Sequence, residues 1–151
     1  MTRINIIQPS ELTDQHLLGE YREITMVPAA LTKTLNSKRG LDKSKISKKY
    51  KLNKGHVYFF FDKGLYLDKR YDELVYEMKQ RGFKPDPNRK FPKEVFPKDL
   101  YNDWMPTLEE QKIIRKRIEE KIAMKPEWYR KYGKNLVKSE FFIILVLTIN
   151  K

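Results

Sequence analysis

Five prolines within residues 83–106 exclude a regular helix from the middle of this 151-residue chain. Proline lacks an amide proton, and its ring collides with the preceding turn of a helix. The five are Pro85, Pro87, Pro92, Pro97 and Pro106. We therefore expect a long loop with short turns here, held in place by Phe91, Phe96, Tyr101 and Trp104.

Apolar residues recur at helical spacing on the N-terminal side of that loop. They are Leu17, Tyr21, Ile24, Leu31 and Leu35. Steps of three, four and seven residues predict a helix over residues 13–36, with Thr13 or Asp14 as the cap of its first turn. Because Pro28 lies inside the pattern, we expect a kink or a local break in this helix.

Two more helices are predicted on either side of the proline-rich loop. The first covers residues 63–81, and Gly82 is expected to end it. The second begins with Thr107 and Glu110, which form the sequence pattern of a capping box, and it ends before Pro126. The predicted fold class is all-α: a single compact domain of three main helices joined by long loops.

Two segments between the first two helices are predicted to be non-helical. Residues 37–56 are polar and contain Gly40 and Gly55, which indicates a loop. Its basic residues, which we call the basic loop (residues 38–54), are Lys38, Arg39, Lys43, Lys45, Lys48, Lys49, Lys51 and Lys54. The run Val57-Tyr58-Phe59-Phe60-Phe61 is apolar at every position. It is interpreted as a short buried strand or a buried extended segment.

The charge of the chain points to a polyanionic partner. The formal net charge is +12, and a surface with that excess repels itself unless it meets negative charge. Nucleic acid is the first candidate, and an anionic membrane is the second. The chain has no cysteine, which excludes disulfides and cysteine-bound zinc and suits a reducing cytosol.

The longest apolar run, Phe141 to Ile149, lies near the C-terminus and is interrupted only by Thr148. A helix of this length is too short to span a bilayer, which takes roughly 20 residues. We interpret the run as a terminal strand or a packed or frayed tail, with a membrane-associating tail as the alternative. No signal peptide is visible at the N-terminus.

One face of the first helix carries a polar stripe. His16, Glu20 and Glu23 are spaced by four and three residues, so they share a face beside the apolar stripe. Partly buried carboxylates at such an edge suit acid–base chemistry. The same pattern also fits a solvated helix face with Arg22 nearby, or a metal site, although His56 is far away in sequence.

Several blocks of sequence resemble the phage-type pyrimidine-dimer DNA glycosylase family, in the same order and at similar spacing from residue 2 to about residue 134. They begin with Thr2-Arg3-Ile4-Asn5, Asp14-Gln15-His16-Leu17 and Glu20-Tyr21-Arg22-Glu23, and continue with Lys45-Ile46-Ser47, Gly55-His56-Val57, Phe59-Phe60-Phe61-Asp62-Lys63, Arg81-Gly82-Phe83, Glu120-Lys121-Ile122-Ala123, Pro126-Glu127-Trp128-Tyr129 and Tyr132-Gly133-Lys134. The resemblance implies three helices with long loops. It also implies an enzyme that cuts the N-glycosidic bond at a pyrimidine dimer and nicks the strand by β-elimination, without a metal or organic cofactor.

The resemblance also implies roles for individual residues. Thr2 would supply its α-amine as the nucleophile once Met1 is removed, and Glu23 would be the catalytic carboxylate. The implied phosphate or lesion contacts are Arg3, Arg22, Arg117 and Lys121. The implied neighbours of the catalytic site are Gln15 and His16, and the implied substrate-contacting tail is Trp128 to Tyr132. Within this tail, Trp128 and Tyr129 are expected to line the opened DNA or, alternatively, to be ordinary core aromatics. The basic loop, including Lys45, would hold phosphates whatever the DNA sequence.

Three positions depart from the family pattern. Met26 stands where arginine is usual, Thr32 where a basic residue is usual, and Lys131 where a further aromatic is usual. The chain could therefore act on another lesion or on abasic sites. A non-catalytic DNA-binding protein and a small metal-dependent nuclease that uses His16, Glu20 and Glu23 as ligands are the alternatives from other classes.

The expected organisation is a glycosylase-like domain over residues 1–134 with a C-terminal extension over residues 135–151. The expected partner is damaged double-stranded DNA, and neither a membrane nor an obligate protein partner is expected. We expect a monomer in the cytoplasm of a bacterial or phage-infected cell.

Overall fold

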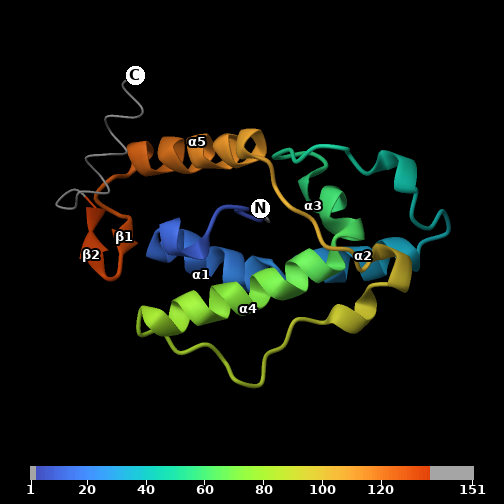
Figure 1. The fold of residues 1–151 in the computed structure, drawn as a ribbon, viewed down its shortest axis with the longest axis horizontal. Helices are drawn as coiled ribbons and strands as arrows, with labels where there is room; N and C mark the ends of the chain where they lie inside the picture. The colour runs from blue at the N-terminus through green and yellow to red at the C-terminus, as the bar shows by residue number, and fades with distance from the viewer. Residues whose placement is uncertain (1–2, 137–151) are drawn as a thin grey trace.

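Five α-helices and a small hairpin make up the regular structure of the computed structural model, which describes residues 3–136. The helices are α1 (Asp14–Glu23), α2 (Met26–Leu35), α3 (His56–Phe59), α4 (Gly64–Gln80) and α5 (Leu108–Met124). Short 3-10 turns, η1 to η5, cover Pro9–Glu11, Lys43–Lys45, Phe60–Asp62, Lys93–Val95 and Lys98–Leu100. In Figure 1, α5 lies above and α4 below, with α1 and the N-terminal segment between them. The all-α class is confirmed.

The first predicted helix is divided into α1 and α2, as the proline within it led us to expect. The division falls at Ile24 and Thr25, and Ile24 is four residues before Pro28. In a continuous helix the carbonyl of Ile24 would have no amide donor and would collide with the proline ring. The chain avoids the collision by turning there, and Pro28 becomes the third residue of α2, where no donor is needed.

The prediction of a strand or extended segment at Val57–Phe61 is wrong. The run forms α3 and then η3 (Phe60–Asp62), beginning after Gly55, whose φ is 86°. Phe59, Phe60 and Phe61 are all buried, because α2 and α4 both contact this short helical segment. An apolar run enclosed on all sides has no periodicity, so its pattern does not distinguish strand from helix.

The other two predicted helices and the loop between them are confirmed. Helix α4 ends in a Schellman motif, in which the amide of Phe83 donates to the carbonyl of Met78 and Gly82 takes a φ of 86°. Helix α5 begins with the capping box of Thr107 and Glu110. The intervening residues form a loop with the two short turns η4 and η5.

The chain after α5 forms a two-stranded hairpin that the sequence pattern did not predict. Strands β1 (Arg130–Lys131) and β2 (Lys134–Asn135) pair antiparallel. Tyr132 and Gly133 join them with φ values of 53° and 76°, the positive angles that a tight hairpin turn requires. Most of the expected C-terminal extension, including the apolar run from Phe141, lies outside the described residues.

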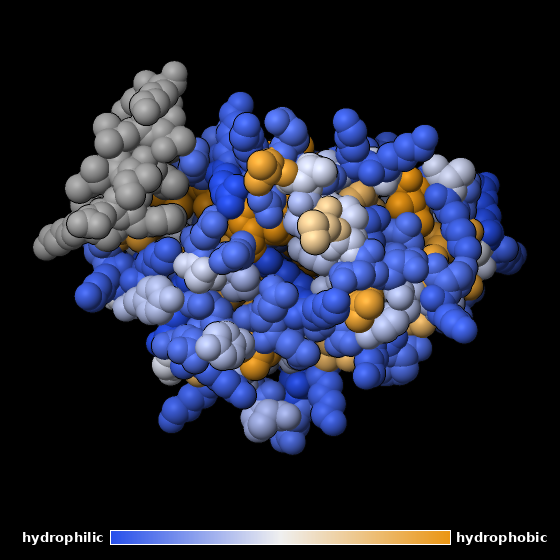
Figure 2. Space-filling view, viewed as in Figure 1, coloured by the Kyte–Doolittle hydropathy of each residue, from blue (hydrophilic) through white to orange (hydrophobic). Residues whose placement is uncertain are grey.

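The N-terminal segment lies in the core, which the sequence analysis did not anticipate. Ile4, Ile6 and Ile7 are buried together with Asn5. They pack in one cluster with residues from α1, α4 and α5, such as Leu17, Leu74 and Ile118. Figure 2 shows a largely hydrophilic face, with small apolar areas showing through near α5. Within residues 3–136, no helix has the length and apolar character that crossing a membrane requires.

Candidate active site and DNA-contacting surface

The N-terminal segment meets the end of helix α1 at Glu23. The backbone amide of Arg3 donates a hydrogen bond to Glu23 Oε2 at 3.2 Å. Both residues are partly buried. The described chain therefore begins with its backbone directed at a carboxylate, while Thr2 lies outside the described residues.

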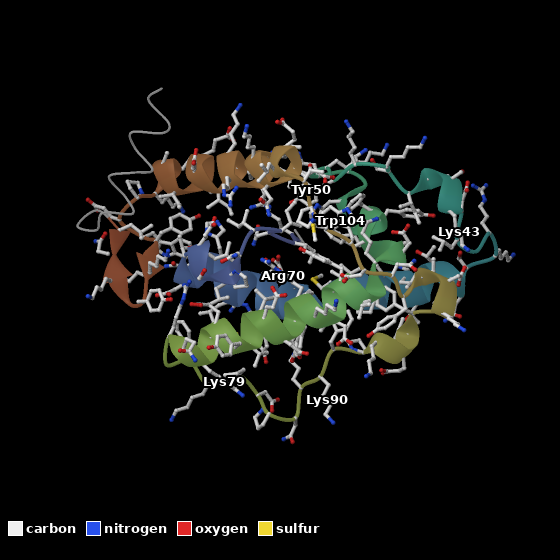
Figure 3. The ribbon with its side chains drawn as sticks, viewed as in Figure 1. Lys43, Tyr50, Arg70, Lys79, Lys90 and Trp104 are labelled. Atoms are coloured by element: carbon white, nitrogen blue, oxygen red, sulfur yellow. The ribbon has the colours of Figure 1, made fainter. Side chains whose placement is uncertain are left out.

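Side chains from other parts of the chain hold the backbone of this segment. The amide of Ile4 donates to His56 Nε2 at 2.8 Å, and the carbonyl of Ile4 accepts from the Tyr50 hydroxyl at 2.9 Å. The amide of Asn5 donates to a carboxylate oxygen of Glu20 at 2.9 Å, and its carbonyl accepts from Arg70 at 2.6 Å. Figure 3 labels Tyr50 and Arg70 near the centre of the view, where this segment runs. A sheet would satisfy such groups with another strand, whereas here buried side chains do so.

Glu20 and Arg70 form a buried ion pair between α1 and α4. Arg70 Nε lies 2.7 Å from one oxygen of Glu20 and Nη2 lies 2.9 Å from the other. The Arg70 side chain is 3% exposed and the Glu20 side chain is 0% exposed. Burial opposes the charged guanidinium, yet the Glu20 carboxylate holds the pKa of Arg70 above its ordinary value. Glu20 therefore stabilises the fold as one half of a buried ion pair. Glu23, on the same helix face, is only half-buried.

The residues of the polar stripe of α1 therefore lie in different surroundings. Glu20 lies in the core, so a fully solvated stripe is not what the structure shows. Within residues 3–136, no group of three or more acidic or histidine side chains is placed to hold a metal ion. The pKa of His16 is lowered to about 4, first by burial and then by the charge of Arg3. His16 is therefore neutral near pH 7, and it lies close enough to Arg3 to respond to its charge.

His16 also connects helix α1 to the segment after α5. Its ring stacks on Tyr129, with centroids 5.0 Å apart and planes 4° from parallel. Its Nδ1 lies 2.6 Å from the Thr13 hydroxyl. Burial raises the pKa of Tyr129. The first turn of α1 thus anchors this aromatic segment beside the end of the chain that carries Arg3.

Gln15 holds the same segment through its backbone. Gln15 Nε2 donates to the carbonyl of Trp128 at 2.7 Å, and Gln15 Oε1 accepts from the amide of Arg130 at 2.9 Å. Tyr129 is buried, whereas Trp128 is 58% exposed and packs edge-on against Tyr129. The interpretation as ordinary core aromatics therefore fits Tyr129 and does not fit Trp128.

The remaining basic candidates lie on three surfaces. Arg22 is exposed on α1, and Lys45 is exposed in the basic loop at η2. Arg117 and Lys121 are partly buried on α5, four residues apart and so on one face. The guanidinium of Arg117 lies 3.8 Å from the carboxylate of the exposed Glu120, and so long a pair at the surface holds Arg117 only weakly.

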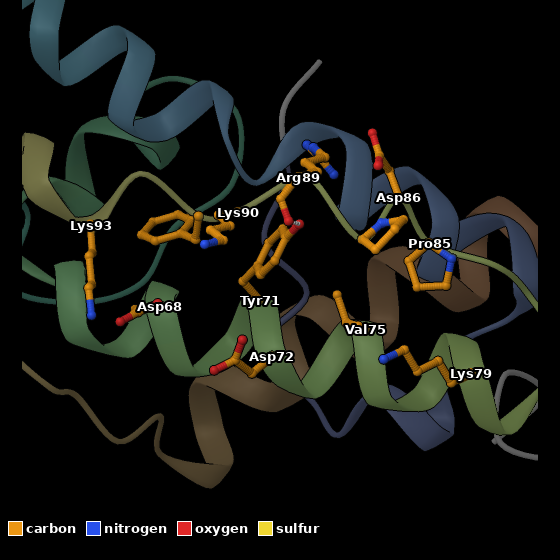
Figure 4. A pocket seen from close by; sticks show the side chains of 12 residues that line it. Asp68, Tyr71, Asp72, Val75, Lys79, Pro85, Asp86, Arg89, Lys90 and Lys93 are labelled. Carbon is orange, nitrogen blue, oxygen red and sulfur yellow. Dashed lines mark hydrogen bonds between the residues drawn. The ribbon is translucent and has the colours of Figure 1, made fainter.

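A groove of about 500 Å³ lies between α4 and the loop that follows it, and neither Arg3 nor Glu23 lines it. Figure 4 shows Asp68, Asp72 and Lys79 from α4 facing Asp86 and Lys90 from the loop. Both signs of charge are present, so the groove does not select an anion. The candidate active site is instead the region around Glu23, where the Arg3 amide meets the carboxylate.

Sequence reasoning missed Tyr50, His56 and Arg70 as residues that position the site. A signal for one of them was present. Arg70 follows Leu67 by three residues and precedes Leu74 by four, so it falls on the apolar stripe of α4. Glu20, three residues after Leu17 and four before Ile24, lies at the border between the polar and the apolar stripe of α1. Two opposite charges on or at the border of two apolar stripes predict a buried ion pair, because a lone buried charge is costly.

The chain matches a known protein-family model. Residues 1–91 match the family model described as pyrimidine dimer DNA glycosylase, which is more than half of the chain. The match includes Arg3, Glu23 and the side chains that hold the N-terminal segment. Helix α5 and the hairpin lie beyond it.

Proposed function

The chain belongs to the pyrimidine dimer DNA glycosylase family, and on this basis we propose that it cuts the glycosidic bond through an imine to its own N-terminal amine and then nicks the strand. The nucleophile of this proposal is the α-amine of Thr2 after removal of Met1, and its partner is Glu23. The proposal covers duplex DNA that contains a pyrimidine dimer.

The hydrogen bond from the Arg3 amide to Glu23 is the observation that carries the proposal. Neighbouring Cα atoms are about 3.8 Å apart across a trans peptide bond. Residue 2 is joined directly to Arg3, and the amide of Arg3 is bonded to the Glu23 carboxylate. In any conformation, residue 2 is therefore no more than one residue away from that hydrogen bond. An amine at the start of such a chain has Glu23 within reach, which supports the pairing.

An α-amine suits this chemistry better than a lysine does. Its ordinary pKa is about 7.7–8.0, whereas that of lysine is about 10.4, so a useful fraction is unprotonated near neutral pH without deep burial. The amine attacks C1′ of the sugar, and the base departs with the electrons of the glycosidic bond. The attached amine loses a proton, the C1′–O4′ bond opens, and O4′ takes up a proton, which gives the imine. The imine acidifies the hydrogens at C2′. Loss of one of these protons expels the 3′ phosphate and breaks the strand.

Glu23 has two tasks in this scheme. As an anion it stabilises positive charge that develops on the sugar while the base leaves, as carboxylates do in glycoside cleavage. It then accepts and returns protons at the imine stage. Its half-buried position on α1, next to a backbone amide, keeps it reachable by DNA and oriented towards the N-terminal segment.

The DNA contacts of the proposal come from the basic residues and the aromatic tail. Arg3, Arg22, Arg117 and Lys121 contact phosphate or the lesion, and the basic loop with Lys45 holds the backbone through charge. Trp128 is exposed and can stack in the opened duplex, since a damaged and poorly stacked site is the easiest to open. Gln15 and His16 support this tail from α1, Gln15 through the backbone of Trp128 and Arg130 and His16 through the ring of Tyr129.

Borohydride trapping on a dimer-containing duplex tests the proposal. Reduction of the imine should leave a covalent complex that maps by mass spectrometry to the N-terminal residue. Blocking the terminus with a retained tag should abolish both trapping and nicking. Trapping at a lysine, no trapping at all, or full activity of the blocked protein would overturn the proposal.

The variant Glu23→Gln separates catalysis from binding. It keeps the shape of the side chain and removes its charge, so we expect loss of base release with DNA affinity retained. The measurement is single-turnover cleavage alongside a binding titration on the same duplex. Nicking by this variant at close to the wild-type rate would remove Glu23 from the mechanism. A non-catalytic DNA-binding protein would show no cleavage in either form.

The lesion itself is tested by comparing substrates. Met26 is 53% exposed at the start of α2, and the Thr32 hydroxyl is bonded to the carbonyl of Pro28 in its own helix. Neither supplies a cation to the duplex. Cleavage of a dimer-containing duplex well above that of an abasic or undamaged duplex supports the proposed substrate. Activity that survives EDTA argues against a metal-dependent nuclease.

A further inference from the structure

Both the amide and the carbonyl of Ile4 are held by side chains, one from the basic loop (Tyr50) and one from just after it (His56). Its amide donates to His56 Nε2 at 2.8 Å and its carbonyl accepts from the Tyr50 hydroxyl at 2.9 Å. The rings of Tyr50 and His56 pack edge-on, with centroids 5.3 Å apart. Both side chains are buried, so neither contact is open to replacement by solvent.

The bonds to His56 fix its protonation and its tautomer. A backbone amide only donates, so the Nε2 atom facing Ile4 carries no proton. The other ring nitrogen, Nδ1, lies 2.8 Å from the carbonyl of Lys51, and a carbonyl only accepts. His56 is therefore the neutral tautomer with its proton on Nδ1. A second proton on Nε2 would place two donors against each other.

These contacts connect two functional parts of the molecule. Lys51 is an exposed residue of the basic loop, and its carbonyl is one end of the series. His56 links that carbonyl to the amide of Ile4, and the preceding residue, Arg3, donates to Glu23. The loop proposed to hold phosphate is thus joined, through the His56 ring and the Tyr50 hydroxyl, to the backbone that leads to the proposed nucleophile.

We propose that His56 is a positioning residue for the reaction, which as a neutral ring sets the N-terminal segment against Glu23 and couples that placement to the basic loop. This inference rests on the function proposed above. His56 does not reach the substrate in this scheme. It acts through Ile4, and protonation of its Nε2 releases the segment.

The groups around His56 determine the pH at which the segment is released. Burial lowers the pKa of His56, the hydrogen bond to the Lys51 carbonyl raises it, Arg3 on the N-terminal segment lowers it, and Glu20 on α1 raises it. Tyr50 and Phe60 pack against the ring as aromatic neighbours. The net effect is a lowered pKa, so the ring stays neutral near pH 7 and the segment is released only in acid.

Two substitutions at His56 separate positioning from mere packing. Glutamine offers an acceptor for the Ile4 amide and a donor for the Lys51 carbonyl, and it does not titrate. Leucine fills the space and offers neither. We expect His56→Gln to keep most of the single-turnover rate with a weaker loss in acid. We expect His56→Leu to lose about 10- to 100-fold in that rate, since a displacement of about 1 Å can cost as much, with DNA affinity unchanged.

A third variant covers the case in which His56→Leu does not fold. Tyr50→Phe removes only the hydroxyl that binds the Ile4 carbonyl. It should lower the single-turnover rate in the same way, by a smaller factor, and leave DNA affinity unchanged. Folding of each variant is checked by circular dichroism and thermal melting before the rates are compared.

The outcomes are distinguishable from those that test the proposed function. Wild-type trapping at the N-terminal residue is the reference, and its absence overturns both proposals. With trapping intact, wild-type rates in His56→Leu and Tyr50→Phe overturn the positioning role alone. So does equal loss of rate in His56→Gln and His56→Leu, or a loss of DNA affinity that accounts for the slower rate.

Discussion

The stability of this protein should fall in acid, and His16 should account for a measurable part of the loss. His16 has a pKa lowered from 6.5 to about 4 by burial and by Arg3, whereas in the unfolded chain it returns to its ordinary value. As the pH falls through 6.5 the unfolded state takes up the proton first. Stability is therefore complete above about pH 6.5 and is lost as the pH falls towards 4.

The size of the effect follows from the shift. One pKa unit corresponds to about 1.4 kcal/mol, so the full shift is worth about 3 kcal/mol. Between about pH 7.5 and pH 5, the linkage relation gives a loss of about 2 kcal/mol from this one group. That is a large share of the stability of a small domain, which is about 5–15 kcal/mol.

Urea unfolding across this pH range measures the effect, with His16→Phe as the comparison. Phenylalanine keeps an aromatic ring for stacking on Tyr129 but cannot titrate. His56 and the carboxylates remain in both proteins, so the difference between the two pH profiles isolates His16. We expect the variant to lose about 2 kcal/mol less than the wild type over the range. Parallel profiles would refute the reasoning, because they would show that His16 titrates alike in both states.

Three further changes test the packing and the charge of the fold. Arg70→Met leaves the buried Glu20 carboxylate without a counter-charge and removes a donor from the carbonyls of Asn5 and Ile7, so it should cost about 3–5 kcal/mol in denaturant unfolding; a cost below about 1 kcal/mol would contradict the buried pair. Gly64→Ala places a Cβ 2.6 Å from an aromatic ring atom and should cost about 1–3 kcal/mol, whereas Gly19→Ala, with nothing within 4 Å, should stabilise the helix by up to about 1 kcal/mol. Lys45→Ala should lower the slope of log binding constant against log salt concentration by about one unit. Lys79→Ala, on the α4 side of the molecule, should leave this slope unchanged. Equal effects of the two changes would show that the basic loop does not contact DNA.

Local signals in the sequence were enough for the main helices. The break before Pro28 follows from proline sterics, and the ends of α4 and α5 follow from Gly82 and from the capping box at Thr107. These features depend on residues close together in the chain. The aromatic run after His56 gave no such signal, since a segment buried on all sides can satisfy either a helix or a strand.

Long-range pairing was the part that local patterns did not reveal. Residues Ile4 to Ile7 carry no helical spacing, and their burial depends on partners in α4 and in the segment before α3. The charge of Arg70 on an apolar stripe could have indicated one partner, as could that of Glu20 at the border of one. The link from His56 to Ile4 had no sequence signal, because a histidine in a polar loop is compatible with many surroundings.

Residues 4–7 cannot be buried as soon as they are synthesised. Three of the residues that hold this segment, Tyr50, His56 and Arg70, follow their partners in it by 46, 52 and 65 positions. At about 5–20 residues per second, Arg70 leaves the ribosome about 3–13 s after Ile4. For much of that interval the N-terminal segment lacks Tyr50, His56 and Arg70 and has only Glu20 and Glu23 of α1 to bond to, so enzymes that trim a chain terminus have access to it. Once α4 has been synthesised, the segment can be buried in the core. Trimming of the N-terminus therefore competes in time with folding.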